Sequence, residues 1–208
     1  MRDTENTVPH IVVSRLPVYL RALMLMEEQG KSYTSSLELS TYLGCTSAQI
    51  RKDLSHFGEF GKQGTGYSVA GLQKHLRNIL NLNHEWPVIV VGAGHIGSAI
   101  ANYTGFSQRG FRVAAVFDNN PEKVGNKIGQ FVVRDFSELG SFIKEHPARH
   151  AMLAVPAAAA QSVANTLINH GITAILNYAP VNLSCPANVQ VEYIDPAVHL
   201  QVMTYRVG

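Results

Sequence analysis

The chain has 208 residues, which suits one large domain or two small ones, and a hydrophobic content of 46% is sufficient for a buried core. The longest apolar run is too short to cross a bilayer and the first residues lack a signal-peptide pattern, so we expect a cytoplasmic protein. Its two cysteines, Cys45 and Cys185, lack metal-ligand spacing, and neither a disulfide framework nor a metal site is expected.

The formal net charge of +2 is unevenly distributed along the chain. Between Arg51 and Arg77, five basic residues stand against two acidic ones, whereas from Glu85 onward eight basic residues offset eight acidic ones. The positive field therefore belongs to the N-terminal third, where a nucleic acid is a plausible partner.

The first predicted helix follows a stretch, residues 1–13, that shows no clear periodicity and is expected to be an arm or a strand-like lead-in. Ser14 can cap this helix, and Pro17 is tolerated within its first turn. Apolar residues at helical spacing continue as far as Gly30, which is a suitable stop.

A helix-turn-helix is predicted next. The capping-box pattern Ser35-Ser-Leu-Glu38 opens one helix, Gly44 allows a sharp turn, and Ser47 is expected to cap another helix that ends at Phe57. The polar face of that last helix is expected to contact DNA. Its candidate contact residues are Gln49, Arg51, Lys52 and Ser55.

Residues 58–67 contain four glycines, one lysine and two aromatic residues, a composition typical of a tight hairpin that can lie close to a phosphate backbone. After a helix-turn-helix such a hairpin is a wing, with Lys62 and Tyr67 as candidate DNA contacts. Helical spacing resumes from Leu72 to Leu82. The alternative for this whole region is a helical dimerisation or capping domain with solvated charges.

A dinucleotide-binding motif follows in Val88-Ile-Val-Val-Gly-Ala-Gly-His-Ile-Gly97. Four branched apolar residues predict a buried parallel strand, and helical spacing resumes after G-x-G-x-x-G. Gly92 allows the tight turn, Gly94 lets the backbone approach a pyrophosphate, and Gly97 lets the helix pack closely on the strand. The helix-start amides and the helix dipole then hold the phosphates.

A second strand, residues 112–117, ends at Asp118, which lies 21 residues after Gly97. That is the place of the acid that binds the adenosine ribose hydroxyls, and its charge disfavours a 2′-phosphate, so NAD⁺/NADH is the expected cofactor.

Strands and helices alternate beyond Asp118, as a parallel sheet requires. One strand ends at Val155 and Pro156, another leads into the loop Asn177-Tyr-Ala-Pro180, and ligands bind beyond such carboxyl ends. Asp195 is expected to cap a final helix with Pro196 in its first position. The predicted cofactor-binding residues are Gly92, Ala93, Gly94, His95, Ile96, Gly97, Tyr103, Asp118, Val155, Pro156 and Tyr178.

Most dinucleotide-binding domains belong to oxidoreductases, so a short NAD-dependent oxidoreductase with an accessory N-terminal helical domain is one alternative. A six-stranded nucleotide domain, however, uses nearly all of the residues after the domain boundary. The sequence offers no Ser/His/Asp order, no paired carboxylates and no Tyr-x-x-x-Lys pair, and no catalytic residue is predicted. A sensor of NAD(H) is favoured, and a nucleotide-binding module that regulates a protein partner is a third possibility.

Several segments together resemble the Rex family of bacterial redox-sensing transcriptional repressors. Gln49 to Lys62 and Gly64-Thr-Gly-Tyr67 are similar to its recognition helix and wing. The phosphate loop, Val155-Pro-Ala, Ile175-Leu-Asn-Tyr-Ala-Pro180 and Ile194-Asp195 are similar as well, and the match extends from about Ser14 to near the C-terminus.

The resemblance implies an α/β homodimer built from three parts: an N-terminal winged helix-turn-helix domain over residues 1–84, a Rossmann-type NAD(H)-binding domain over 85–194, and a C-terminal helix over 195–208 that is exchanged between subunits. It also implies a repressor that binds palindromic operator DNA when it is free or NAD⁺-bound and is released by NADH.

The resemblance further implies a redox switch made of Arg21, Tyr103 and Asp195. Tyr103 and Asp195 correspond to the pair joined near the nicotinamide across the dimer, and Arg21 to the winged-helix residue that competes for the acid. The chemistry agrees with this assignment, because the positive ring of NAD⁺, which NADH lacks, acts directly on a nearby carboxylate.

Overall fold

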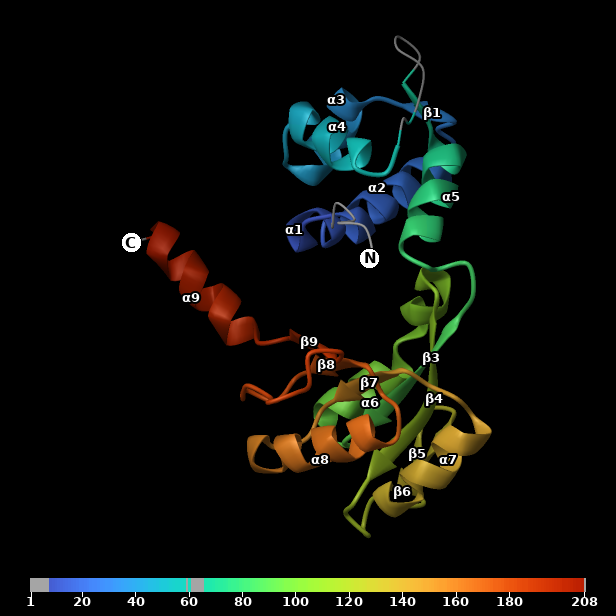
Figure 1. Ribbon diagram of the computed structural model, residues 1–208, viewed down its shortest axis with the longest axis vertical. Helices are drawn as coiled ribbons and strands as arrows, with labels where there is room; N and C mark the ends of the chain where they lie inside the picture. The colour runs from blue at the N-terminus through green and yellow to red at the C-terminus, as the bar shows by residue number, and fades with distance from the viewer. Residues whose placement is uncertain (1–7, 59, 61–65, 208) are drawn as a thin grey trace, which may run out of the picture. The chain divides into compact units, whose positions relative to one another are not determined.

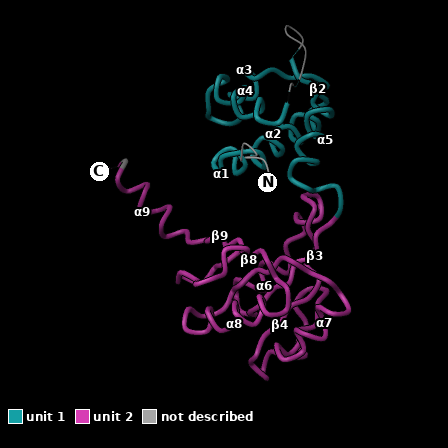
Figure 2. Tube along the Cα trace, in the orientation of Figure 1, with its two compact units in different colours: residues 1–84 teal, residues 85–208 magenta. Residues whose placement is uncertain are grey.

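The computed structural model describes residues 8–58, 60 and 66–207. The chain divides into two compact units, residues 1–84 and residues 85–208 (Figure 2). Within the described residues, no helix is long and apolar enough to cross a membrane. Lys62, a candidate wing contact, lies outside the described residues.

The first unit is a small helical domain with a two-stranded antiparallel sheet (Figure 1). An apolar cluster at its centre is drawn from four of its helices, with Leu16, Leu23, Met26, Ile50 and Leu76 fully buried. Its described elements are α1 (His10–Val13), α2 (Leu16–Glu28), β1 (Tyr33–Thr34), α3 (Ser36–Leu43), α4 (Ser47–Ser55), β2 (Tyr67–Ser68) and α5 (Val69–Ile79).

The start of the chain differs from the expectation. Residues 10–13 form the short helix α1 and not an arm or a strand-like lead-in, and Ser14 ends α1 where we expected it to begin α2. Arg15 occupies the N-cap of α2, and Pro17 lies in its first turn as predicted.

The helix-turn-helix is formed by α3 and α4. Ser35 caps α3 by accepting a hydrogen bond from the Glu38 amide, and Gly44 ends it in a left-handed conformation with φ of 64°. The α4 cap is Thr46, which accepts from the Gln49 amide, so the expectation that Ser47 would cap this helix was wrong by one residue. Both side chains can cap, and the position of the turn decides between them.

The second unit is a doubly wound parallel sheet in the order β5-β6-β4-β3-β7-β8-β9 (Figure 1). All of its pairings are parallel except that of β5 with β6, an edge hairpin that the sequence pattern did not indicate. The strands are β3 (Trp86–Val91), β4 (Phe111–Asp118), β5 (Lys127–Ile128), β6 (Phe131–Asp135), β7 (His150–Leu153), β8 (Ala174–Asn177) and β9 (Gln190–Tyr193).

Helices cover both faces of this sheet. Ile89 and Val91 face α7 and α8, while their neighbours Val88 and Val90 face α6, so side chains alternate between two apolar layers. The helices are α6 (His95–Asn102), α7 (Leu139–Glu145), α8 (Ala157–Asn169) and α9 (Pro196–Val207), with 3₁₀ segments at Thr104–Arg109 and Phe136–Glu138.

Two boundaries in this unit also differ from the expectation. The strand that was expected to end at Val155 and Pro156 is β7, which ends at Leu153, and the alanine run after Pro156 forms the first turn of α8 because alanine is the strongest helix former. Asn177 is the last residue of β8, where its buried side chain bonds to Ala179 and Val181 and shapes the loop that follows.

Candidate functional site

The carboxyl ends of four neighbouring strands meet at one edge of the sheet. Val91 at the end of β3 is paired with Phe117 of β4 and Leu153 of β7, and Leu153 is paired with Asn177 of β8. The residues that follow these positions are Gly92, Asp118, Ala154 and Tyr178. Segments up to 86 residues apart in the sequence thus converge where open α/β sheets bind ligands.

The three glycines of the motif occupy three different environments. Gly92 has φ of 103°, and a Cβ there would overlap the Ala154 carbonyl oxygen. A Cβ on Gly97 would overlap the Gly92 carbonyl, because α6 packs directly on the loop. A Cβ on Gly94, in contrast, would meet nothing within 4 Å. The first and third glycines are therefore required by packing, and the second borders open space.

That open space lies at the start of α6. Gly94 is the N-cap and has no side chain to bond to the amides of the first helical turn, and His95 and Ile96 are exposed there. Helix-start amides together with the positive end of the helix dipole form a binding site for an anion such as a pyrophosphate. These residues fit the expected dinucleotide.

Asp118 lies against the same loop. Its Oδ2 accepts hydrogen bonds from the Ala93 amide at 2.7 Å and from Lys123 Nζ at 3.2 Å, and its Oδ1 accepts from the Asn120 amide at 2.8 Å. Burial acts to raise the pKa of Asp118, but these hydrogen bonds outweigh it and hold the pKa below its ordinary value. Asp118 is therefore an ionised acceptor beside the phosphate loop.

The other predicted cofactor and switch residues are distributed over the second unit and α2. Val155 lies against Gly92, and Pro156 precedes α8. The Tyr178 amide bonds to the Leu153 carbonyl, and burial raises the pKa of its phenol. Tyr103 is half-exposed at the end of α6 and packs edge-on against Phe106. Asp195 caps α9 as expected, with Oδ1 accepting from the Ala197 amide at 2.9 Å.

The predicted DNA-contact residues of α4 fall into two groups. Arg51, Lys52 and Ser55 are exposed, and Arg51 donates to Ser36 Oγ at 3.0 Å. Gln49 is half-buried and donates from Nε2 to Asp53 Oδ1 at 2.6 Å. Tyr67 is half-buried in β2, where burial raises the pKa of its phenol. Three of the four candidates on α4 are therefore exposed, and Gln49 is half-buried and bonded to Asp53.

Two charged residues that shape these sites were not predicted from the sequence. Asp53 is fully buried among Arg15, Tyr19 and Gln49, and Lys123 bonds to Asp118. One feature of the sequence could have predicted the burial of Asp53, because this residue lies between Ile50 and Leu54 on the apolar face of α4. Nothing in the local pattern indicated that Arg15, 38 residues earlier, would pair with it.

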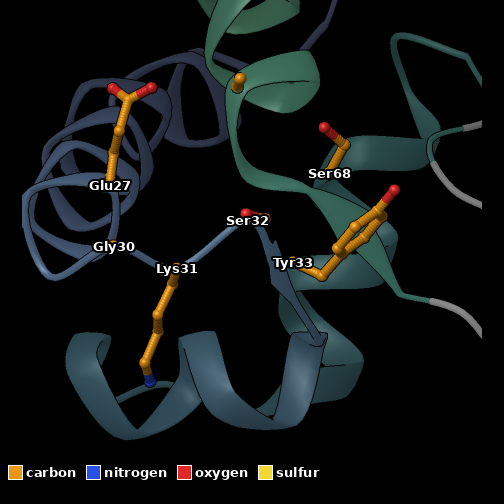
Figure 3. A pocket seen from close by; sticks show the side chains of 7 residues that line it. Glu27, Gly30, Lys31, Ser32, Tyr33 and Ser68 are labelled. Carbon is orange, nitrogen blue, oxygen red and sulfur yellow. The ribbon is translucent and has the colours of Figure 1, made fainter.

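A shallow hollow in the first unit contains none of the predicted site residues (Figure 3). It is lined by Glu27, Gly30, Ser32, Tyr33 and Ser68 among others, and the Lys31 side chain there pairs with Glu38. The described residues also contain no group of three or more His, Cys, Asp or Glu side chains that could hold a metal ion.

Comparisons with known proteins agree with this two-part organisation. A family model described as the CoA binding domain matches residues 83–181, and one described as a putative DNA-binding protein N-terminus matches residues 7–55. A redox-sensing transcriptional repressor Rex of Chloroflexus aurantiacus is 50% identical, with 98% of this chain and 96% of the relative covered. The Rex of Carboxydothermus hydrogenoformans is 43% identical, with 96% of each chain covered.

The chain belongs to the Rex family of redox-sensing transcriptional repressors. Solved Rex-family structures share its fold. The repressor RSP in complex with NAD⁺ and operator DNA is 38% identical and superimposes with a TM-score of 0.91, covering 98% of this chain and 94% of RSP. RSP in complex with NADH is 36% identical, with a TM-score of 0.87 and coverage of 98% and 95%.

The fold class is therefore that of a Rex repressor, an N-terminal DNA-binding domain followed by a Rossmann-type domain, as the sequence analysis predicted. Rex proteins are transcriptional repressors and not enzymes, which argues against the oxidoreductase alternative.

Proposed function

We propose that the protein is a homodimeric repressor in the cytoplasm that binds palindromic operator DNA when it is free or NAD⁺-bound and is released by NADH. The observation that carries this proposal is the near full-length similarity to Rex repressors, one of which has been solved with NAD⁺ and operator DNA and also with NADH. The cofactor is NAD⁺/NADH and the partner is double-stranded DNA.

The dinucleotide is held by the edge of the sheet in this proposal. The amides of Gly94, His95 and Ile96 face the pyrophosphate, and Asp118 accepts from the adenosine ribose hydroxyls. Support comes from the open space in front of Gly94 and from the ionised state of Asp118 beside the same loop. The nicotinamide supplies the redox-dependent charge, and Val155, Pro156 and Tyr178 border its side of the site.

DNA is held by the first unit. The exposed face of α4 carries Arg51, Lys52 and Ser55, and the wing carries Lys62 and Tyr67. Phosphate contacts from the basic residues supply most of the affinity, so binding weakens steeply with salt. A two-fold dimer presents two copies of α4 to two half-sites about one helical turn apart, which explains a palindromic target.

Two exposed surfaces support the dimer. On α9, Val198, Leu200, Val202 and Met203 are each more than half exposed, an unusual state for apolar residues of one short helix. On α2, Arg21 is exposed between Val18 and Leu25, which are also exposed. Exchange of α9 between subunits would cover its apolar residues.

The switch consists of Tyr103, Asp195 and Arg21. The Asp195 carboxylate is attracted by the positive ring of NAD⁺ and released from that attraction in the NADH state, where it is free to accept from Tyr103. Arg21, which competes with Tyr103 for Asp195, then loses that carboxylate as its partner. The DNA-binding domains rotate, and the spacing of the two recognition helices no longer fits the operator. NADH can shift the equilibrium between the two states only by the difference between its binding free energies for them.

The test is selection of duplex DNA from a random pool in the presence of NAD⁺, followed by a challenge with NADH or NADPH at fixed salt. We expect a palindrome that NADH releases and NADPH does not. If no sequence is enriched, the proposed repressor function is contradicted. If a sequence is enriched but NADH does not release it, only the proposed switch is contradicted.

A further inference from the structure

Asp53 of α4 is the centre of a buried hydrogen-bond cluster. Its Oδ2 accepts from Arg15 Nε and from the Tyr19 hydroxyl, both at 2.6 Å. Its Oδ1 accepts from Arg15 Nη2 at 2.7 Å and from Gln49 Nε2 at 2.6 Å. Asp53 is buried, and the cluster joins the start of α2 to the helix expected to enter the DNA groove.

The ionised state of Asp53 determines how Gln49 is oriented. Burial acts to raise the pKa of Asp53, but hydrogen bonds from Arg15, Tyr19 and Gln49 outweigh burial and hold the pKa below its ordinary value. A carboxylate only accepts hydrogen bonds, so the Gln49 amide must turn its NH₂ group toward Asp53. Its carbonyl oxygen, Oε1, is directed away from the carboxylate.

Gln49 is also well placed to meet a base. It is the third residue of α4, and the first residues of a recognition helix are the ones that contact base edges in the major groove. A glutamine that can rotate freely uses both its NH₂ and its oxygen to bind adenine, whereas an oxygen alone accepts from the exocyclic amine of either cytosine or adenine.

We propose that Asp53 is a positioning residue for base recognition, which locks the Gln49 amide so that only its oxygen is offered to the major groove. Gln49 then selects a base whose exocyclic amine lies in the major groove, cytosine or adenine, over guanine or thymine at one position of each half-site. This inference rests on the proposed operator binding.

Asp53→Asn is the decisive substitution. Each carboxylate oxygen accepts from one Arg15 nitrogen and from one further donor, Gln49 at Oδ1 and Tyr19 at Oδ2. The substitution is therefore made in the Tyr19→Phe background, where only Gln49 can accept from the new NH₂ group, which then occupies the Oδ1 position opposite it. The Gln49 amide then rotates to accept from it and offers its own NH₂ to the groove. That group donates to guanine O6 or N7, to thymine O4 or to adenine N7, whereas cytosine offers it no acceptor in the major groove, so the preference for cytosine over guanine is expected to reverse.

The experiment measures the affinity of each variant for the selected operator and for duplexes in which every half-site base pair is replaced in turn. At one position we expect the parent protein to prefer cytosine or adenine by about tenfold. Gln49→Met removes the acceptor and should abolish that preference, and Asp53→Asn in the Tyr19→Phe background should reverse the preference for cytosine over guanine. Tyr19→Phe is the matched control, because it removes one donor but leaves the carboxylate and the Gln49 orientation intact.

The outcomes separate this inference from the proposed function. If Gln49→Met and Asp53→Asn weaken all duplexes by one common factor and leave base preference unchanged, Asp53 is a structural residue only and the inference is wrong. If Asp53→Asn does not fold, as judged by its circular dichroism, the retained or lost preference of Gln49→Met decides alone. Failure of the parent protein to bind any operator would overturn the proposed function together with this inference.

Discussion

The two units of the protein build their candidate sites in different ways. The sheet edge of the second unit presents mainly backbone, and its loop is shaped by glycines at Gly92, Gly94 and Gly97, where side chains are missing. The proposed DNA-binding face of the first unit presents side chains of one helix, and the orientation of Gln49 on that helix depends on buried polar partners that include Arg15 from a distant segment. A site made of backbone groups can be predicted from the spacing of its residues, whereas a site made of side chains also depends on the contacts that orient them.

The sharpest test of the backbone site compares two glycines three residues apart. Gly97→Ala places a Cβ on the Gly92 backbone carbonyl, so we expect a loss of about 1–3 kcal/mol in unfolding free energy and no measurable NADH binding. Gly94→Ala places its Cβ in open space, and we expect a nearly unchanged melting temperature but NADH affinity weakened by at least tenfold. Calorimetry and NADH titration measure both quantities.

Equal losses of stability in the two variants would contradict the distinction between a packing glycine and a ligand-facing glycine. Full NADH affinity in Gly94→Ala would remove the start of α6 from the dinucleotide site.

Asp195→Ala tests whether the two units communicate through the proposed switch. We expect operator affinity in NAD⁺ to be retained within about twofold, while the NADH concentration that releases half of the DNA rises by at least tenfold, a coupling loss of about 1.4 kcal/mol. Fluorescence anisotropy of a labelled operator measures both. Because Asp195 also caps α9, Asp195→Asn, which keeps a capping group, is the control. A fully responsive Asp195→Ala variant would exclude the residue from the switch.

Lys52→Ala probes the side-chain site on exposed α4. If Lys52 contacts a phosphate, operator and unrelated DNA should be weakened by the same factor, and the slope of log affinity against log salt should decrease in magnitude by about 1. Lys144→Ala on α7, another exposed lysine that lies in the second unit, should leave both unchanged. A loss confined to the operator would show that Lys52 contacts a base.

The smallest effect concerns pH, and it involves both units. Asp53 and Asp118 have pKa values below their ordinary range in the folded protein, so each stabilises the fold above its unfolded pKa of about 3.9 and loses this contribution as pH falls through its folded pKa. The contribution of these two carboxylates to the unfolding free energy should therefore be constant near neutrality and decrease below about pH 4. For Asp118→Asn the decrease should be shallower, and an identical pH profile would contradict the depressed pKa of Asp118.

The sequence predicted the tight turn at Gly92, the close packing at Gly97 and the convergence of the strand ends, because the backbone alone requires these glycines and a parallel sheet brings its strand ends together. That this edge binds a dinucleotide stays a prediction. The sequence also predicted the Ser35 cap and the Gly44 turn, which depend on local geometry. The sequence did not predict β1, because two residues are too few to show the alternation of apolar and polar side chains that marks a strand, and they pair with β2 only in the folded chain. It missed the burial of Asp53 because Arg15 is distant in sequence. The assignments of Arg21, Tyr103 and Asp195 to one switch stay predictions.

The most direct test of the central claim is thermodynamic reciprocity between the two ligands. If NADH weakens operator binding by a given factor, operator DNA must weaken NADH binding by the same factor, because both ligands act on one equilibrium between two states. NADH affinity should be measured by calorimetry with the protein free and with the protein saturated by operator, at one salt concentration. We predict equal factors of at least tenfold. An NADH affinity that is the same with and without operator would contradict a redox-sensing switch in this protein.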